Sequence, residues 1–177
     1  MLSMDDSDRV VYASSFSKTV CPGIRVGYLV GPADAIAGIR KLATNTYISP
    51  NMVAQSIVAE FCHSGAIERS IATVKDALRE RRDATADALE RHIPDARFVK
   101  PQGGYFLWVD LPEGTDVNAL AAGAAERGVV FVKGTDFLIE GGGSSLRIAY
   151  SAVPPDQIEE GIARVADAYR ELAGAAA

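Results

Sequence analysis

Cysteine and histidine are scarce in this chain, which has only Cys21, Cys62, His63 and His92. The two cysteines lie far apart and form no C-x-x-C pair, so the disulfide framework of small secreted domains is absent. A reducing compartment is therefore expected, and we predict a cytoplasmic protein. Neither histidine stands at a spacing typical of metal ligands, which argues against a zinc site or any other metal.

Long apolar runs and an excess of basic residues are also lacking. No run approaches the roughly 20 apolar residues of a membrane-spanning helix, and residues 1–6 have neither the basic start nor the apolar middle of a signal peptide. The chain carries 18 basic and 23 acidic residues, a net charge of -5, whereas proteins that bind nucleic acid usually present a basic face. We expect no membrane partner and no nucleic-acid partner.

Short strands and helices alternate along the chain. Hydrophobic residues make up 48% of the 177 residues, enough to bury a domain core. Periodicity and turn residues predict strands at 9–13, 25–30, 98–99, 104–109, 129–132 and 145–151, and helices at 33–44, 50–61, 65–92, 117–127 and 158–172. This alternation is typical of layered α/β architectures. We place a domain boundary inside the long helix, near residue 80.

A small polar loop, Ser14 to Lys18, follows the first predicted strand, and Arg25 follows it after a Pro-Gly turn. Hydroxyl groups and a planar guanidinium are the groups that bind phosphate well, because arginine forms charge-assisted hydrogen bonds to it. A lysine beside a bound phosphate can attack an aldehyde on the same ligand as an amine nucleophile. The segment therefore predicts a site for a phosphorylated aldehyde.

The candidate residues of this segment, and Arg147 near the end of the chain, also have ordinary structural interpretations. Ser15 and Ser17 could simply form a loop, and Arg25 could be a charge at the end of a strand. Arg147, between two apolar neighbours in a predicted strand, could form a structural ion pair. Aromatic residues at the fourth predicted strand are more often part of a core than of a site. We expect this of Phe106 and Trp108, whereas Tyr105 is also considered as a site residue.

Four segments in order resemble class I/II aminotransferases of fold type I. They are S-F-S-K-T-V-C-P-G-I-R-V-G-Y-L-V-G-P (residues 15–32), P-Q-G-G-Y-F-L-W-V-D-L-P (101–112), V-V-F-V-K-G-T-D-F (129–137) and L-R-I-A-Y-S (146–151). The chain is most similar to the subgroup that includes 2-aminoadipate and multi-substrate aminotransferases. The resemblance implies an α/β fold in which residues 1–80 are the C-terminal remnant of the large cofactor-binding domain. Residues 81–177 would form the small C-terminal domain.

The same resemblance implies a cofactor and a reaction. Pyridoxal 5'-phosphate would be bound as a Schiff base to Lys18, and its phosphate would be held by Ser15, Ser17 and Arg25. Arg147 would pair with the α-carboxylate of the substrate. The enzyme would transfer an amino group from an α-amino acid to a 2-oxo acid, and it would act as a homodimer.

Family members carry a long segment before the lysine strand, and its acidic partner for the pyridine nitrogen is not found here. We therefore expect a fragment, a truncated product or part of a split enzyme, with little activity of its own. Regulators of the GntR type, in which an aminotransferase-like domain senses the cofactor, are the main alternative. Decarboxylases and carbon-sulfur lyases share the fold, whereas the Ser15-x-x-Lys18 pattern of penicillin-recognising enzymes lacks its companion motifs here.

Overall fold

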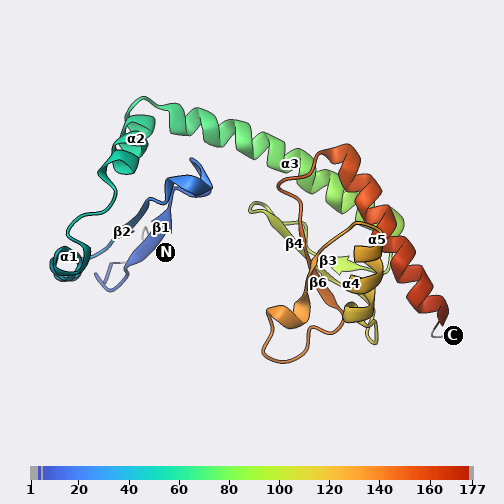
Figure 1. Cartoon of the computed structure of the whole chain (residues 1–177). Coiled ribbons are helices and arrows are strands. Elements are labelled where there is room, and N and C mark those ends of the chain that lie inside the picture. Colours follow the sequence, from blue (N-terminus) through green and yellow to red (C-terminus); the bar gives the residue numbers. More distant parts are fainter. Residues whose placement is uncertain (1–3, 5, 176–177) are drawn as a thin grey trace. The chain divides into compact units, whose positions relative to one another are not determined.

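The computed structural model describes residue 4 and residues 6–175, so most of the N-terminal hexapeptide lies outside the described residues. The chain forms two compact units, one ending at Thr73 and the other beginning at Val74. The division falls within α3 (Ala66–His92), the long helix in which the sequence places a domain boundary near residue 80 (Figure 1). That domain boundary stays a prediction. Each unit is described separately below.

The N-terminal unit contains a two-stranded antiparallel sheet and two helices. Strand β1 (Tyr12–Ser15) pairs with β2 (Gly27–Val30), and the short 3-10 helix η2 (Pro22–Ile24) lies between them in sequence. Helices α1 (Ala33–Tyr47) and α2 (Met52–His63) follow. Ala54 and Val58 are the only buried hydrophobic residues described in this unit. Packing therefore contributes little to its stability, because burial of apolar surface is the main favourable term in folding.

The C-terminal unit contains a four-stranded antiparallel sheet in the order β3-β4-β6-β5. These strands span Arg97–Phe98 (β3), Phe106–Asp110 (β4), Ser145–Ala149 (β6) and Val132–Lys133 (β5). The second part of α3, α4 (Val117–Glu126) and α5 (Pro155–Ala175) pack against one face of the sheet around a common core (Figure 1). The short helix η3 (Gly134–Asp136) follows β5.

Alternation along the strands decides which residues enter this core. Leu107 and Val109 of β4 and Leu146 of β6 are at most 1% exposed and pack with the helices. Since successive side chains of a strand point to opposite faces, Trp108 and its cross-strand partner Arg147 lie on the other face of the sheet. The helices of this core pack only on the face of Leu107, Val109 and Leu146.

The ends of α4 are set by local chemistry. Asp116 accepts hydrogen bonds from the backbone N–H groups of Asn118 and Ala119, as an N-cap residue does. At the other end Gly128, with φ of 75°, donates its backbone N–H to Ala125, and Val129 donates to Ala124. This pattern is the Schellman motif. The prediction of a strand from residue 129 is therefore wrong at its start, because the N–H of Val129 caps the helix and β5 begins only at Val132.

Two further boundaries differ from the sequence-based expectation. Ser14 and Ser15 belong to β1 and not to a loop, because they pair with Tyr28 and Gly27 of β2. Helix α1 continues to Tyr47, beyond the predicted end near residue 44. The other predicted helices and strands are confirmed within a few residues at their ends.

The described part of the chain offers neither a helix fit to cross a membrane nor a cluster of metal ligands. None of its helices combines the length and the apolar character needed to cross a bilayer. Its histidine, cysteine and acidic side chains do not gather in groups of three or more that could hold a metal ion.

Substitution of a core residue tests this assignment of the sheet faces. Leu120 of α4 is fully buried, so Leu120→Ala should lower the free energy of unfolding of the C-terminal unit by about 2–5 kcal/mol. Ile139 is fully exposed, and Ile139→Ala should change it by less than about 0.5 kcal/mol. Urea unfolding followed by circular dichroism measures both. Equal effects of the two substitutions would show that the core is wrongly placed.

Candidate active site

The turn that carries Lys18 is held by backbone hydrogen bonds. The N–H of Phe16 donates to the carbonyl of Val26 over 2.9 Å, and the N–H of Val20 donates to the carbonyl of Phe16 over 2.8 Å. These bonds close the turn directly after β1 and tie it to the start of β2. Ser17 and Lys18 are thereby presented together, with Lys18 exposed.

Arg25 reaches back to this turn through an unusual backbone conformation. It follows η2 and adopts φ 52° and ψ 35°, the left-handed region that residues other than glycine seldom enter. Its Nη1 atom donates to the hydroxyl oxygen of Ser17 over 3.4 Å. Backbone strain of this kind costs about 1–3 kcal/mol and often occurs at functional sites. The conformation brings a guanidinium group beside a hydroxyl group.

The donor set fits a phosphate group. Of the three expected phosphate ligands, Ser17 and Arg25 are in contact, and Ser15 lies at the end of β1 opposite Gly27. A Cβ atom at Gly27 would lie 3.1 Å from the carbonyl oxygen of Ser14, so glycine permits the close approach of the two strands. Hydroxyl and guanidinium donors, with a lysine amine on the same turn, suit an anionic ligand that also carries an aldehyde.

Arg147 lies between two aromatic rings. Its guanidinium carbon is 4.0 Å from the ring centroid of Phe106 and 4.2 Å from that of Phe137. Its Nε atom is buried without a hydrogen-bond partner, and within the described residues Arg147 forms no ion pair. The structural ion pair considered from the sequence is thus not formed there. A guanidinium group without an acidic partner is available to a carboxylate ligand.

The sequence-based interpretation did not anticipate that Phe106 and Phe137 contact Arg147. Phe106 was expected in the core, but it is 43% exposed and lies on the same sheet face as Arg147. Alternation of Phe106, Leu107 and Trp108 was the available signal, because residues two apart in a strand share a face. For Phe137, which follows η3, no sequence signal indicated the contact.

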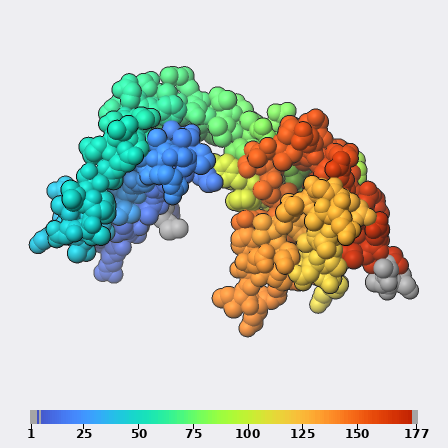
Figure 2. Space-filling view, in the orientation of Figure 1, coloured from blue at the N-terminus to red at the C-terminus, as the bar shows by residue number. Residues whose placement is uncertain are grey.

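A close contact between two glycines shapes the segment that carries Phe137. A Cβ atom at Gly134 would lie 2.7 Å from the carbonyl oxygen of Gly142, and one at Gly142 would lie 2.6 Å from the carbonyl carbon of Gly134. The N–H of Phe137 donates to the carbonyl of Gly134 over 3.0 Å. Residues 134–143, coloured orange, protrude at the lower edge of the C-terminal unit (Figure 2). The backbone contact fixes the base of this protruding segment.

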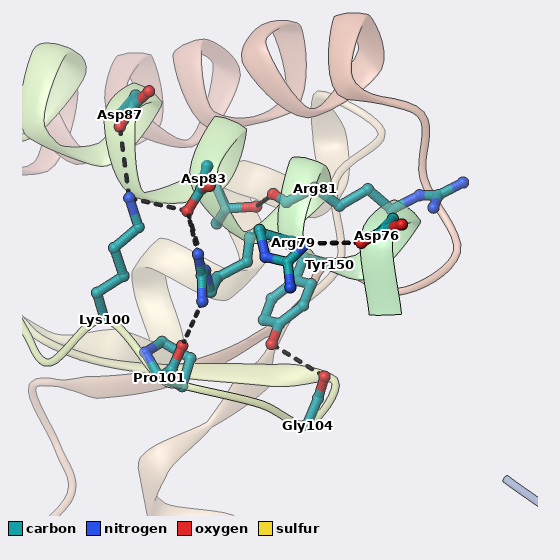
Figure 3. Close-up of polar contacts among 11 residues, drawn as sticks. Asp76, Arg79, Arg81, Asp83, Asp87, Lys100, Pro101, Gly104 and Tyr150 are labelled. Carbon is teal, nitrogen blue, oxygen red and sulfur yellow. Dashed lines mark hydrogen bonds and ion pairs between the residues drawn. The ribbon is translucent and has the colours of Figure 1, made fainter. Parts of the chain in front are cut away.

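An ion-pair network holds the chain that leads into β4 (Figure 3). Arg82 of α3 donates from Nη1 to the carbonyl oxygen of Pro101 over 3.2 Å and pairs with Asp83 at 2.8 Å. Lys100 pairs with the same carboxylate at 2.9 Å. The hydrogen bond from Lys100, followed by that from Arg82, lowers the pKa of Asp83 below its ordinary value.

Tyr150 holds the same segment through two further hydrogen bonds. Its hydroxyl donates to the carbonyl oxygen of Gly104 over 3.0 Å (Figure 3). Its backbone N–H donates to the carbonyl of Tyr105 over 3.1 Å. The side chain is 1% exposed, and burial raises the pKa of its phenol above the ordinary value. The start of β4, and with it Phe106, is therefore anchored to the core.

Comparison with models of known protein families assigns the chain to a family. The model of the family described as aminotransferase class I and II matches residues 1–165. The chain belongs to this family. Among the curated relatives of this aminotransferase chain, the 2-aminoadipate transaminase of Thermus thermophilus is 34% identical over 165 residues, which are 92% of this chain and 41% of the relative.

Solved structures of aminotransferases resemble the structure of this chain. The α-aminoadipate aminotransferase of Thermus thermophilus, in complex with N-(5'-phosphopyridoxyl)-L-leucine, matches with a TM-score of 0.82 and 32% identity over 93% of this chain and 43% of that one. The expected fold, part of an α/β fold type I aminotransferase, is confirmed. A regulator, TauR of Rhodobacter capsulatus, is 35% identical over 95% of this chain and 35% of its own length. The chain spans about two fifths of the length of the curated aminotransferases it matches.

The two glycines allow a matched test of the segment that carries Phe137. Gly141 and Gly142 have φ of 81° and 77°, but a Cβ atom at Gly141 would meet nothing within 4 Å. Gly141→Ala should therefore cost about 1–2 kcal/mol, the penalty for a left-handed alanine. Gly142→Ala adds a backbone clash and should cost clearly more, with faster amide hydrogen exchange over residues 134–145. Equal effects of the two substitutions would contradict the glycine contact.

The lowered pKa of Asp83 makes a pH-dependent prediction. A carboxylate whose pKa is lowered in the folded state stabilises the fold above its unfolded pKa and loses this contribution as the pH falls through the folded value. Asp83→Asn should lower the free energy of unfolding at pH 7, by less than about 1 kcal/mol because the side chain is 38% exposed. Below a pH of about 3.8 the difference from the wild type should shrink. A difference that grows in acid, in urea titrations, would contradict the assignment.

Proposed function

We propose that the protein is a pyridoxal-phosphate-dependent aminotransferase that transfers an amino group from an α-amino acid to a 2-oxo acid. The observation that carries the proposal is the contact between Arg25 and Ser17 on the turn of Lys18, formed at the cost of a left-handed arginine. Membership of the aminotransferase family supports it, as does the phosphopyridoxyl ligand of the similar Thermus enzyme.

The residues of the turn would divide the binding of the cofactor between them. Ser15, Ser17 and Arg25 would hold the phosphate, because a guanidinium and hydroxyl groups give charge-assisted hydrogen bonds to it. Lys18 would bind the cofactor covalently as the Schiff-base lysine and would then move a proton at the α-carbon of the substrate. When bound, pyridoxal phosphate supplies the aldehyde and the electron-withdrawing ring that the reaction needs.

Arg147 would bind the α-carboxylate of the substrate. A planar guanidinium can hold a carboxylate through two parallel hydrogen bonds, which fixes the orientation of the α-carbon. The absence of an acidic partner of Arg147 among the described residues supports this role. An arginine that recognises the α-carboxylate fits every α-amino acid, so this contact does not select the side chain of the amino donor.

Sensing of the cofactor by a regulator is the second candidate, and the likeness to TauR favours it. Both candidates use the same cofactor site, but only the enzyme must turn over an amino donor. Conversion of a 2-oxo acid to its amino acid by the protein, followed by chromatography, would therefore favour the enzyme over the sensor. The homodimer implied by the family resemblance, the cytoplasmic location and the origin of the chain as a fragment also remain predictions.

Chemical trapping tests the role of Lys18. The protein is incubated with pyridoxal phosphate and reduced with borohydride, and the label is mapped by mass spectrometry of peptides. We expect the label on Lys18 and its loss in Lys18→Arg, because only this lysine shares a turn with the phosphate ligands. Lys41→Arg in α1 is the matched control and should keep the label. Labelling of other lysines without Lys18 would overturn the proposal.

A further inference from the structure

The contacts of Arg147 differ from those of many other arginines in the chain. Among the described residues, ion pairs join six arginines to carboxylates: Arg79, Arg82, Arg91, Arg127, Arg164 and Arg170. Arg147 is instead covered by Phe106 and Phe137, at 4.0 and 4.2 Å from its guanidinium carbon. The described part of the chain gives it no carboxylate. Its orientation must therefore come from the two rings and from the strand that carries it.

Aromatic rings and a carboxylate use different parts of a guanidinium group. A cation is attracted to the face of an aromatic ring, whereas the N–H donors of arginine lie in the plane of the guanidinium and bind carboxylates edge-on. Because the Nε atom of Arg147 is buried, the in-plane donors that contact with Phe106 and Phe137 would leave for a ligand are those of the two Nη atoms. An acidic neighbour in the same position would compete with the ligand for these donors.

We infer that Phe106 and Phe137 are positioning residues that set the orientation of Arg147 for the substrate carboxylate. The inference rests on the proposed function and deepens it. Arginine side chains lose about 2 kcal/mol of rotamer entropy when they are fixed. Two rings that restrict the guanidinium before the ligand arrives reduce this cost at the moment of binding, as preorganisation does in general.

Both rings are themselves held in place. Phe106 begins β4, which Tyr150 anchors through Gly104 and Tyr105. Phe137 is fixed by the hydrogen bond of its N–H to Gly134 and by an edge contact with Trp108, with ring centroids 6.0 Å apart. Trp108 is also the cross-strand partner of Arg147. The two rings thus come from separate segments of the C-terminal unit, each with its own anchor.

Nuclear magnetic resonance of the protein tests the inference without a catalytic assay. The Nε–Hε signal of Arg147 is assigned by its loss in Arg147→Lys and is followed while sodium acetate is added, with sodium chloride at equal ionic strength as the reference. The rings should shift the signal upfield in the wild type, and acetate should shift it in a saturable way. Phe106→Leu and Phe137→Leu should each reduce the upfield shift and weaken acetate binding by about 2- to 5-fold.

Leu138→Ala is the matched control, because Leu138 is the exposed neighbour of Phe137 and has the same exposed fraction of 45%. It should leave both the upfield shift and the acetate affinity unchanged. Acetate binding that survives unaltered in both phenylalanine variants would overturn the positioning role but leave the carboxylate role of Arg147 intact. Absence of a specific acetate effect on Arg147 in the wild type would instead contradict that part of the proposed function, and the inference with it.

Discussion

Two candidate anion-binding arginines, one in each unit, have no carboxylate partner among the described residues. Arg147 contacts two aromatic rings, and the contact recorded for Arg25 is with the hydroxyl of Ser17. In a chain with more acidic than basic residues, unpaired guanidinium groups require neighbours that hold them without a negative charge. Aromatic faces and hydroxyl groups meet this requirement, because they interact with the cation and leave in-plane donors for an anionic ligand. The proposed binding of anions by Arg25 and Arg147 depends on these uncharged neighbours.

Much of the fold was predictable because local signals and tertiary structure agree. Apolar periodicity and turn residues located each of the described α-helices, and β-branched or aromatic runs located strands of both sheets, but neither 3-10 helix was predicted. One strand prediction failed because a backbone N–H group could bond either to the end of a helix or to a neighbouring strand. At Val129 the N–H bonds to the end of α4 and not to a neighbouring strand, a choice that depends on Gly128 and on the helix geometry more than on the β propensity of the next residues.

The two groups of candidate residues, one in each unit, were predictable from the sequence to different degrees. Lys18, Ser17 and Arg25 lie within one short segment, so a motif in the sequence could bring them together before any fold was known. The neighbours of Arg147 come from separate segments, and only the antiparallel register places Trp108 opposite Arg147. Phe137 joins them through a segment whose base depends on contact between Gly134 and Gly142. Such contacts between distant segments leave no periodic pattern in the sequence.

The two groups of candidate residues also reach their geometry by different physical means. Arg147 is carried by a strand whose neighbour Leu146 is buried in a well-packed core, so its position is fixed by the fold of the C-terminal unit. Arg25 belongs to a unit in which only Ala54 and Val58 are described as buried hydrophobic residues, and its left-handed conformation is held by a few hydrogen bonds. An anion bound to Arg25 and Ser17 would stabilise that conformation by mass action. Binding of an anion would therefore contribute to the order of the lysine turn, whereas the position of Arg147 is set in advance by packing of the C-terminal unit.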